Sequence, residues 1–140
     1  MWIDERGSEV LAVPECRRLL AIGAKESRHG HLGVPQDGAP LVLPVDYAVY
    51  GPDVVLRIGE GLFHQVDARL VAFQVDGVIQ MGAQSKTWSV LVQGLALEDG
   101  EKVSTTHVPH PEVVEPGARI VRIRADVVTG RRFPTAPAAQ

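Results

Sequence analysis

Alternating apolar and polar positions run through most of this chain, and their period predicts β-strands. In the stretch 69–76 one face is apolar and the other polar, and 119–128 repeats this pattern. The stretch 88–97 is the longest of the expected strands. The inward residues of the first stretch are Val71, Phe73 and Val75. Since a period of two is typical of half-buried strands, we expect a chain dominated by β-structure.

The stretch 41–50 differs because it is apolar on both faces, with Val42 on one and Tyr47 on the other. A strand of this kind is normally covered on both sides. Pro44 lies inside it and has no N–H for a ladder, which predicts a bulge or an edge position. Shorter strands are expected at 32–35 and 54–58.

Helical spacing occurs near the start of the chain. Pro14 suits a first helical turn, where a missing N–H costs nothing. Gly23 falls on the apolar face and is expected to end the helix. That face contains Cys16, Leu19 and Leu20. A second, short helix is expected at 62–66.

About six strands with hairpin-like spacing favour antiparallel pairing, and closing such a sheet removes its exposed edges. The residues alone therefore predict a mainly β fold, a small β-barrel with few helices. The length of 140 residues suits one domain, which we expect to span 1–133, followed by a disordered tail at 134–140. The stretches 77–87 and 98–118 are expected to be loops that shape a ligand pocket.

Composition narrows the class of protein. The net charge of −3 and pI near 5.9 give no electrostatic reason to expect nucleic acid as a partner. No stretch approaches the roughly 20 apolar residues of a membrane span. The first residues carry charges where a secretory signal needs an apolar run, and Cys16 is the single cysteine. We therefore expect a soluble cytoplasmic protein without a disulfide.

Four blocks of residues carry a family resemblance. They are Pro-Val-Asp-Tyr at 44–47, Arg-Ile-Gly-Glu-Gly at 57–61, Trp-Ser-Val-Leu-Val-Gln-Gly at 88–94, and a last strand leading into Val-Thr-Gly-Arg-Arg at 128–132. In this order and spacing they resemble the small one-domain members of the flavin-binding split-barrel family related to pyridoxamine 5′-phosphate oxidase. The resemblance implies a six-stranded antiparallel split barrel, FMN as cofactor (alternatively deazaflavin F420), a homodimer, and oxidation or reduction of a small molecule.

The resemblance also implies cofactor contacts. Arg57 is expected to bind the phosphate end of FMN, because a guanidinium beside backbone N–H groups is a good phosphate clamp. The family's lysine in this block is here Phe63, which removes one phosphate cation. The full set of expected cofactor-binding residues is Val45, Asp46, Tyr47, Arg57, Ile58, Gly59, Phe63, Trp88, Ser89 and Gln93.

Two of the strands carry most of these residues. The strand around Asp46 is expected to lie along the isoalloxazine ring, with an acid where the family usually has asparagine. Ser89 and Gln93 share the polar face of the strand 88–97, near the expected dimer interface. Trp88 lies on its apolar face, and packing in a core or interface is the competing interpretation.

Other candidates are less specific. Arg119 stands where relatives often carry a histidine. Arg131 and Arg132 either place a cation near a ligand or partner, or form a solvated basic end. The histidines have no spacing typical of a metal site, so we expect no metal. Cys16 is expected to be a buried, inert thiol, and no catalytic residue is identified.

Three functions remain open from the sequence. A flavoprotein is favoured, because flavins carry out the redox chemistry and no acid–base pair is then required. A cofactor-free dimeric split-barrel binding module is the alternative, and the departures at Asp46, Phe63 and Arg119 support it. A barrel that binds haem or another planar molecule is the third, with no dedicated residue behind it.

Overall fold

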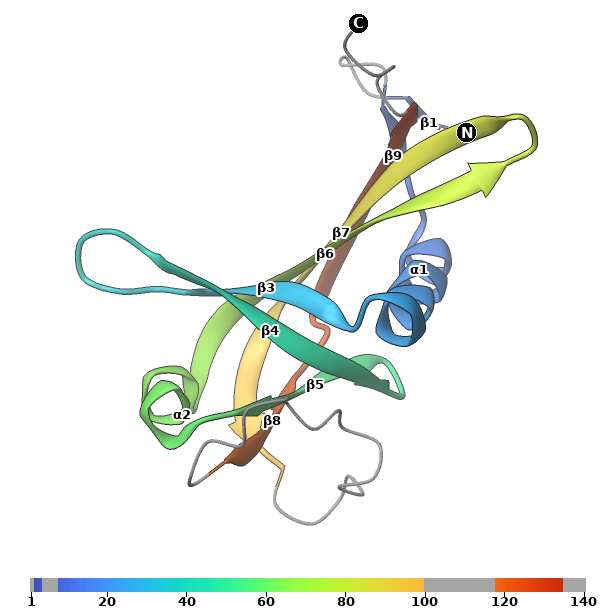
Figure 1. Cartoon of the computed structure of the whole chain (residues 1–140). Coiled ribbons are helices and arrows are strands. Elements are labelled where there is room, and N and C mark those ends of the chain that lie inside the picture. Colours follow the sequence, from blue (N-terminus) through green and yellow to red (C-terminus); the bar gives the residue numbers. More distant parts are fainter. Residues whose placement is uncertain (1, 4–7, 100–117, 135–140) are drawn as a thin grey trace, which may run out of the picture.

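The computed structural model describes residues 2–3, 8–99 and 118–134 (Figure 1). Within these residues it contains nine strands and two helices. Their bounds are β1 Trp2–Ile3, β2 Glu9–Val10, α1 Val13–Glu26, β3 His29–Val34, β4 Leu41–Tyr50, β5 Asp53–Ile58, α2 Glu60–Val66, β6 Arg69–Met81, β7 Gln84–Glu98, β8 Arg119–Ile123 and β9 Val127–Pro134.

Six strands close into an antiparallel barrel in the order β7-β6-β3-β4-β5-β8. Pairing of β8 with the last residues of β7, from Ala96 to Glu98, closes the ring. Further back along β7, β9 takes the place of β8 and pairs from Lys86 to Gln93. The short strands β2 and β1 extend the sheet beyond β9. The expected six-stranded split barrel is confirmed. Three further strands, β9, β2 and β1, continue the sheet from the part of β7 that β8 does not cover.

The expected continuous strand 119–128 is wrong, because the chain turns between β8 and β9. A Cβ at Gly94 of β7 would lie 1.7 Å from the carbonyl oxygen of Arg124. Only glycine lets the turning chain come this close to β7. Asp53 holds the turn, since one carboxylate oxygen accepts from the Ala125 N–H at 3.0 Å and the other from Arg122 Nε at 2.8 Å. Val127, which alternation from Val121 and Ile123 would turn inward, is consequently 48% exposed.

The expected loop 77–87 is also wrong, because it is the outer half of the β6–β7 hairpin. The two strands pair without a break from Arg69 opposite Ala96 to Met81 opposite Gln84. Gly82 turns the chain with a φ of 64°. Figure 1 shows this hairpin projecting beyond the barrel, with β9 alongside. The other expected loop, 98–118, lies mostly outside the described residues.

The expected helix near the start is confirmed as α1, with Cys16, Leu19 and Leu20 buried. It does not end at Gly23, however, and continues to Glu26. A Cβ at Gly23 would lie 2.5 Å from the Tyr47 hydroxyl oxygen. This glycine therefore permits close packing of the helix on the barrel instead of stopping the helix.

The remaining expectations concern β4 and α2. The helix α2 is confirmed and buries Phe63 and Val66. β4 pairs with β5 only from Tyr47 onward, so Pro44 lies at an edge, as its missing N–H predicts. Val42 is 62% exposed, so the residues that the structure describes do not cover the second face of β4 there.

The barrel interior and the side covered by α1 form one hydrophobic core. Its largest fully buried side chains include Tyr47, Leu56, Phe73, Val90 and Ile123. α1 contacts β4, β6, β7 and β9. Among the described residues no helix is long and apolar enough to cross a membrane. Of the expected tail, Pro134 ends β9 and the residues after it lie outside the described part.

Candidate functional site

Several of the expected cofactor-binding side chains lie in the core. Tyr47, Ile58, Phe63 and Trp88 are each at most 5% exposed. The Tyr47 hydroxyl donates to the Leu20 carbonyl at 2.7 Å, and burial raises the pKa of its phenol. Such side chains stabilise the barrel, which leaves their backbone groups as the means of contacting a ligand.

Phe63 and Arg119, two departures from the family pattern, contact each other. The Arg119 guanidinium carbon lies 4.7 Å from the centre of the Phe63 ring, a cation–π geometry. The same guanidinium pairs with Glu60 at 3.5 Å and with Glu98 at 3.2 Å. This cation therefore links α2, β7 and β8, with its charge balanced by two carboxylates.

Arg57 lies on the outside of the barrel. Its neighbours Leu56 and Ile58 are buried in the core, and alternation along β5 turns Arg57 the other way. It stands opposite Ile120 of β8. β5 leads directly into Gly59, the N-cap residue of α2. Arg57 thus lies near the end of a strand, as the sequence predicts. Its Nε atom is buried within the chain.

Asp46 forms a pair that the sequence analysis missed. Its Oδ1 lies 2.6 Å from Nδ1 of His29, the opposite residue on β3. The His29 side chain is 73% exposed and that of Asp46 is 31% exposed. The hairpin register, more than any local motif, brings these two residues together.

Ser89 and Gln93 lie on an open face of the sheet, as their shared face in β7 predicts. We use "outer face" for the side of β3, β6, β7 and β9 that points away from α1. The strand registers place these residues on it: Gly33, Ala72, Gln74, Ser89, Leu91, Gln93, Val127, Thr129 and Arg131. Exposed apolar side chains, including Leu70 at 67% and Val127 at 48%, lie on the same face.

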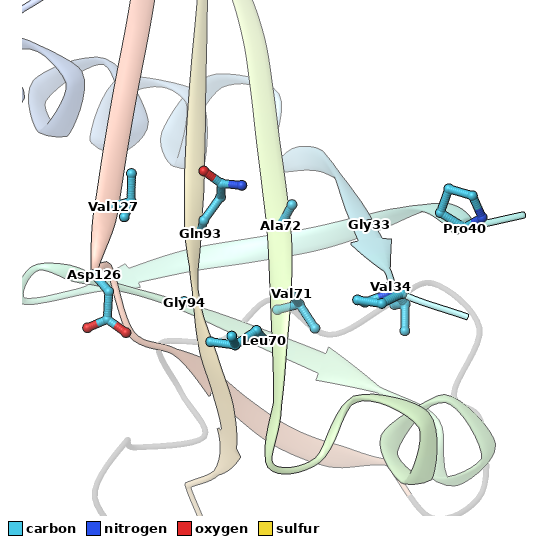
Figure 2. A pocket seen from close by; sticks show the side chains of 11 residues that line it. Gly33, Val34, Pro40, Leu70, Val71, Ala72, Gln93, Gly94, Asp126 and Val127 are labelled. Atoms are coloured by element: carbon cyan, nitrogen blue, oxygen red, sulfur yellow. The ribbon is translucent and has the colours of Figure 1, made fainter. Parts of the chain in front are cut away.

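One hollow of the outer face, here called the apolar pocket, has a volume of about 550 Å³. Figure 2 shows Gln93, Ala72 and Val127 on neighbouring strands, with Asp126 and Pro40 at opposite ends. Its lining residues are Gly33, Val34, Pro35, Pro40, Leu70, Val71, Ala72, Gln93, Gly94, Asp126 and Val127. Ligand sites typically measure roughly 300–1,000 Å³ and are mainly apolar with a few polar groups. The apolar pocket has this character.

A second hollow, here the polar pocket, lies further along β7 and has a volume of about 390 Å³. Its lining residues are Gln74, Ser89, Leu91, Thr129, Gly130 and Arg131. The Gln74 amide donates to the Ser89 hydroxyl at 2.9 Å. The sequence analysis named Ser89 and Arg131 but missed Gln74 and Thr129, because the cross-strand register was needed to find them.

The two adjacent arginines of β9 have different surroundings. The Arg132 side chain is 9% exposed, donates two hydrogen bonds to Glu9 at 2.9 and 3.0 Å, and reaches Glu15 at 3.1 Å. These contacts lower the pKa of Glu9, and Arg18 and Arg132 lower that of Glu15. Arg131 points to the outer face, with Nη1 3.4 Å from the Ser8 hydroxyl. Arg132 is therefore structural, whereas Arg131 lies on the outer face.

Within residues 8–99 and 118–134, no three His, Cys, Asp or Glu side chains group closely enough to hold a metal ion. Cys16 is fully buried, as expected, and burial raises the pKa of its thiol.

The expected site residues do not assemble within one chain. Arg57 lies on β5, whereas Ser89 and Gln93 lie on β7, and β8 separates these strands in the barrel. β8 contacts only the end of β7 near Glu98. From there it is about 30 Å along the strand to Ser89 and about 17 Å to Gln93. One molecule thus presents two separate parts of the expected site.

Known proteins show clear similarity to this chain. The family model described as pyridoxamine 5′-phosphate oxidase matches residues 13–132. The structure of the FAD binding protein from Mycobacterium smegmatis is 25% identical, with a TM-score of 0.68, and the match covers 89% of this chain and 99% of that one. No curated protein matches the chain.

Two further structures have the same fold. A Corynebacterium glutamicum protein, provisionally named as a pyridoxamine 5′-phosphate oxidase, is 24% identical with a TM-score of 0.73, covering 91% of this chain and 98% of its own. A FAD-binding protein from Mesorhizobium loti is 22% identical with a TM-score of 0.68, covering 90% and 98%.

Proposed function

Because the chain belongs to the pyridoxamine 5′-phosphate oxidase family, we propose that it binds a flavin and oxidises or reduces a small molecule. The observation that carries this proposal is the family match over residues 13–132. The likeness to the M. smegmatis FAD binding protein over nearly the whole of both chains supports it. FMN is the cofactor we propose, with FAD and F420 as the alternatives to test. A bound flavin supplies the electron or hydride transfer, and the protein binds and orients it.

The apolar pocket fits a flavin ring. The ring is flat and largely apolar, with hydrogen-bonding groups along one edge. Gly33, Ala72 and Val127 offer apolar contact, and the Gln93 amide can both donate and accept at the edge of the pocket. The pocket volume of about 550 Å³ is in the range of ligand sites. Gln93 is thus the residue we assign to orienting the ring.

A homodimer completes the site in this proposal. Arg57 lies on β5, which β8 separates from β7, and the segment around Asp46 lies on β4, one strand further, so in this proposal a second copy brings these groups to the ring at Gln93. The outer face offers exposed apolar side chains, among them Leu70 and Val127, that a second copy would cover. Arg57 of one subunit then binds the phosphate end of the flavin whose ring lies on the other.

The test is a flavin titration of the purified protein, followed by absorbance and ligand fluorescence, with FMN, FAD and F420 in parallel. Binding of one ligand with a perturbed flavin spectrum and quenched fluorescence is expected. Arg57→Ala should weaken the binding free energy of that ligand by about 1.5–3 kcal/mol, the value of a hydrogen bond to a charged group. Arg17→Ala, at an exposed position of α1, is the matched control and should leave the affinity unchanged.

One observation favours a second candidate, the cofactor-free dimeric binding module. Phe63 replaces a phosphate cation and is buried, and the nearby Arg119 charge is balanced by Glu60 and Glu98. If none of the three ligands binds, the cofactor-free dimeric binding module becomes the favoured function in place of the flavoprotein. An unchanged affinity in Arg57→Ala would instead remove Arg57 from the site while leaving flavin binding intact.

A further inference from the structure

His29 and Asp46 form an imidazole–carboxylate pair on two neighbouring strands. His29 stands opposite Asp46 in the β3–β4 register, and its Nδ1 lies 2.6 Å from Oδ1 of that carboxylate. The His29 side chain is 73% exposed, so most of the ring is open to solvent or a ligand. A carboxylate at Nδ1 sets the tautomer of the ring and leaves Nε2 to exchange a proton. The pair therefore has the arrangement of a base that another side chain orients.

The pair lies on the same face as the apolar pocket. Side chains alternate along β3, so His29, His31 and Gly33 share one side of the strand, and Gly33 lines the apolar pocket. His29 and Gly33 are about 13 Å apart along β3. His31 lies between them, opposite Gln74 of β6. A flavin ring that begins on Gly33 and extends along β3 over His31 therefore has its far edge near His29.

Other titratable side chains of the outer face lie near this pair. His31 is the second imidazole on this side of β3, and Asp76 lies two residues beyond Gln74 on β6. The Gln74 amide contacts Asp76 at 3.3 Å. Asp46 is the carboxylate in contact with His29. A test of His29 must therefore distinguish it from His31.

Oxidation of a small molecule by a flavin leaves one proton to be accepted. The flavin takes an electron pair and one hydrogen from a C–H bond, and the adjoining O–H or N–H of the substrate loses its proton. We propose that Nε2 of His29 accepts this proton, and that Asp46 is the positioning residue that holds the imidazole and balances its new charge. The N–H bond on His29 forms as the O–H or N–H bond of the substrate breaks. This role rests on the proposed flavin function.

The proposed role gives a signal that requires no substrate. An electrode can supply the electron pair, and the reduced flavin then places a negative charge on the outer face. A nearby negative charge favours the protonated form of an imidazole. Reduction should therefore add a proton from solvent to His29. The midpoint potential of the bound flavin should then fall more steeply with pH than it would without this histidine.

The test is a spectroelectrochemical titration of the full chain loaded with FMN, or with FAD if FMN does not bind. It is repeated across about pH 5–8, the range in which imidazoles titrate. The slope of the midpoint potential against pH should correspond to one more proton per electron pair in the wild-type protein than in His29→Gln. Asp46→Asn should also lower the slope, because the protonated imidazole loses its counter-charge.

His64→Gln is the matched control. His64 of α2 is also an exposed imidazole beside a carboxylate, with a side chain that is 67% exposed and Nε2 3.7 Å from Glu60. Its replacement should keep the wild-type slope.

Three results would overturn the proposal. They are equal slopes in the wild-type protein and His29→Gln, equal losses in His29→Gln and His64→Gln, and a loss in His31→Gln alone, which would assign the proton to His31. If His29→Gln does not bind the flavin, Asp46→Asn decides, and a wild-type slope in that variant contradicts the role of the pair.

The flavin titration separates this proposal from the proposed function. A flavin that binds, with a potential that does not respond to His29→Gln, removes the proton-transfer role and leaves flavin binding intact. If FMN, FAD and F420 all fail to bind, the flavin function is wrong, and the proton-transfer role is wrong with it.

Discussion

At the residue scale, Tyr47 shows how one side chain couples a helix to the barrel. Its ring packs edge-on against Phe73 at 5.1 Å, and its hydroxyl donates to the Leu20 carbonyl at 2.7 Å. Gly23 makes room for the hydroxyl, because a Cβ there would lie 2.5 Å away. The side chain of this expected cofactor residue therefore serves the attachment of α1.

Replacing Tyr47 by Phe tests whether the Tyr47 hydroxyl attaches α1 to the barrel or contacts the cofactor. The Leu20 carbonyl would lose its donor inside the core, so the free energy of unfolding should fall by about 1–3 kcal/mol. Flavin affinity should stay unchanged, since the hydroxyl faces α1. Urea denaturation and flavin titration measure the two quantities. Tyr50→Phe, at a position that is 39% exposed, is the control and should change neither. If flavin affinity falls in Tyr47→Phe but not in Tyr50→Phe, the Tyr47 hydroxyl contacts the cofactor, and the prediction is wrong.

At the element scale, the buried Arg132 joins three segments of the chain. Its guanidinium connects β9 to Glu9 of β2 and to Glu15 of α1. A guanidinium that is 9% exposed needs such partners, because an unpaired buried charge costs several kcal/mol. The N-terminal strands are thereby attached to the edge of the sheet.

This network predicts how stability depends on pH. The folded protein holds the pKa values of Glu9 and Glu15 below their ordinary 4.5. A lowered carboxyl pKa contributes stability above the ordinary value, and that stability is lost as the pH falls through the lowered one. The free energy of unfolding should therefore fall as the pH drops below about 4.5, and less steeply in Arg132→Gln.

Urea titrations at several pH values test this expectation. Arg131→Gln, one position away on the outer face, is the control and should retain the steep fall. Equal slopes in the wild-type protein and Arg132→Gln would show that other carboxylates dominate the acid response.

At the scale of the whole molecule, the outer face decides whether the proposed site is complete. It contains both pockets and a set of exposed apolar side chains, of which Leu70 is the most exposed at 67%. Large exposed apolar patches mark interaction sites. A second copy of the chain is the partner we propose, because the parts of the site at Arg57 and Gln93 lie on β5 and β7, which β8 separates.

Placing a charge on this face should disrupt the dimer. Leu70→Glu would bury an unpaired carboxylate in the interface, so the protein should become monomeric at micromolar concentration and lose flavin affinity at the same time. Sedimentation velocity gives the mass. Val13→Glu, at the 40% exposed start of α1, is the control and should stay dimeric. A monomeric wild-type protein that still binds flavin would contradict the shared site.

Much of this molecule follows from the sequence alone, because the period of apolar residues is a local property. Alternation identified the inward faces of β6 and β7, and helical spacing identified the buried face of α1. Contiguous motifs at 44–47, 57–61, 88–94 and 128–132 carried the family resemblance. Closure of the barrel also followed, since a sheet of about six strands removes its edges by closing.

The tertiary structure decided what depends on strands that are distant in the sequence. Alternation shows which residues of a strand share a face, but not whether α1, the barrel interior or solvent covers that face. Tyr47 and Trp88 are therefore core residues, while Ser89 and Gln93 are open. The chain turn beside Gly94, the His29–Asp46 pair and the convergence of Gln74, Ser89, Thr129 and Arg131 all require the register between strands, which no local pattern contains.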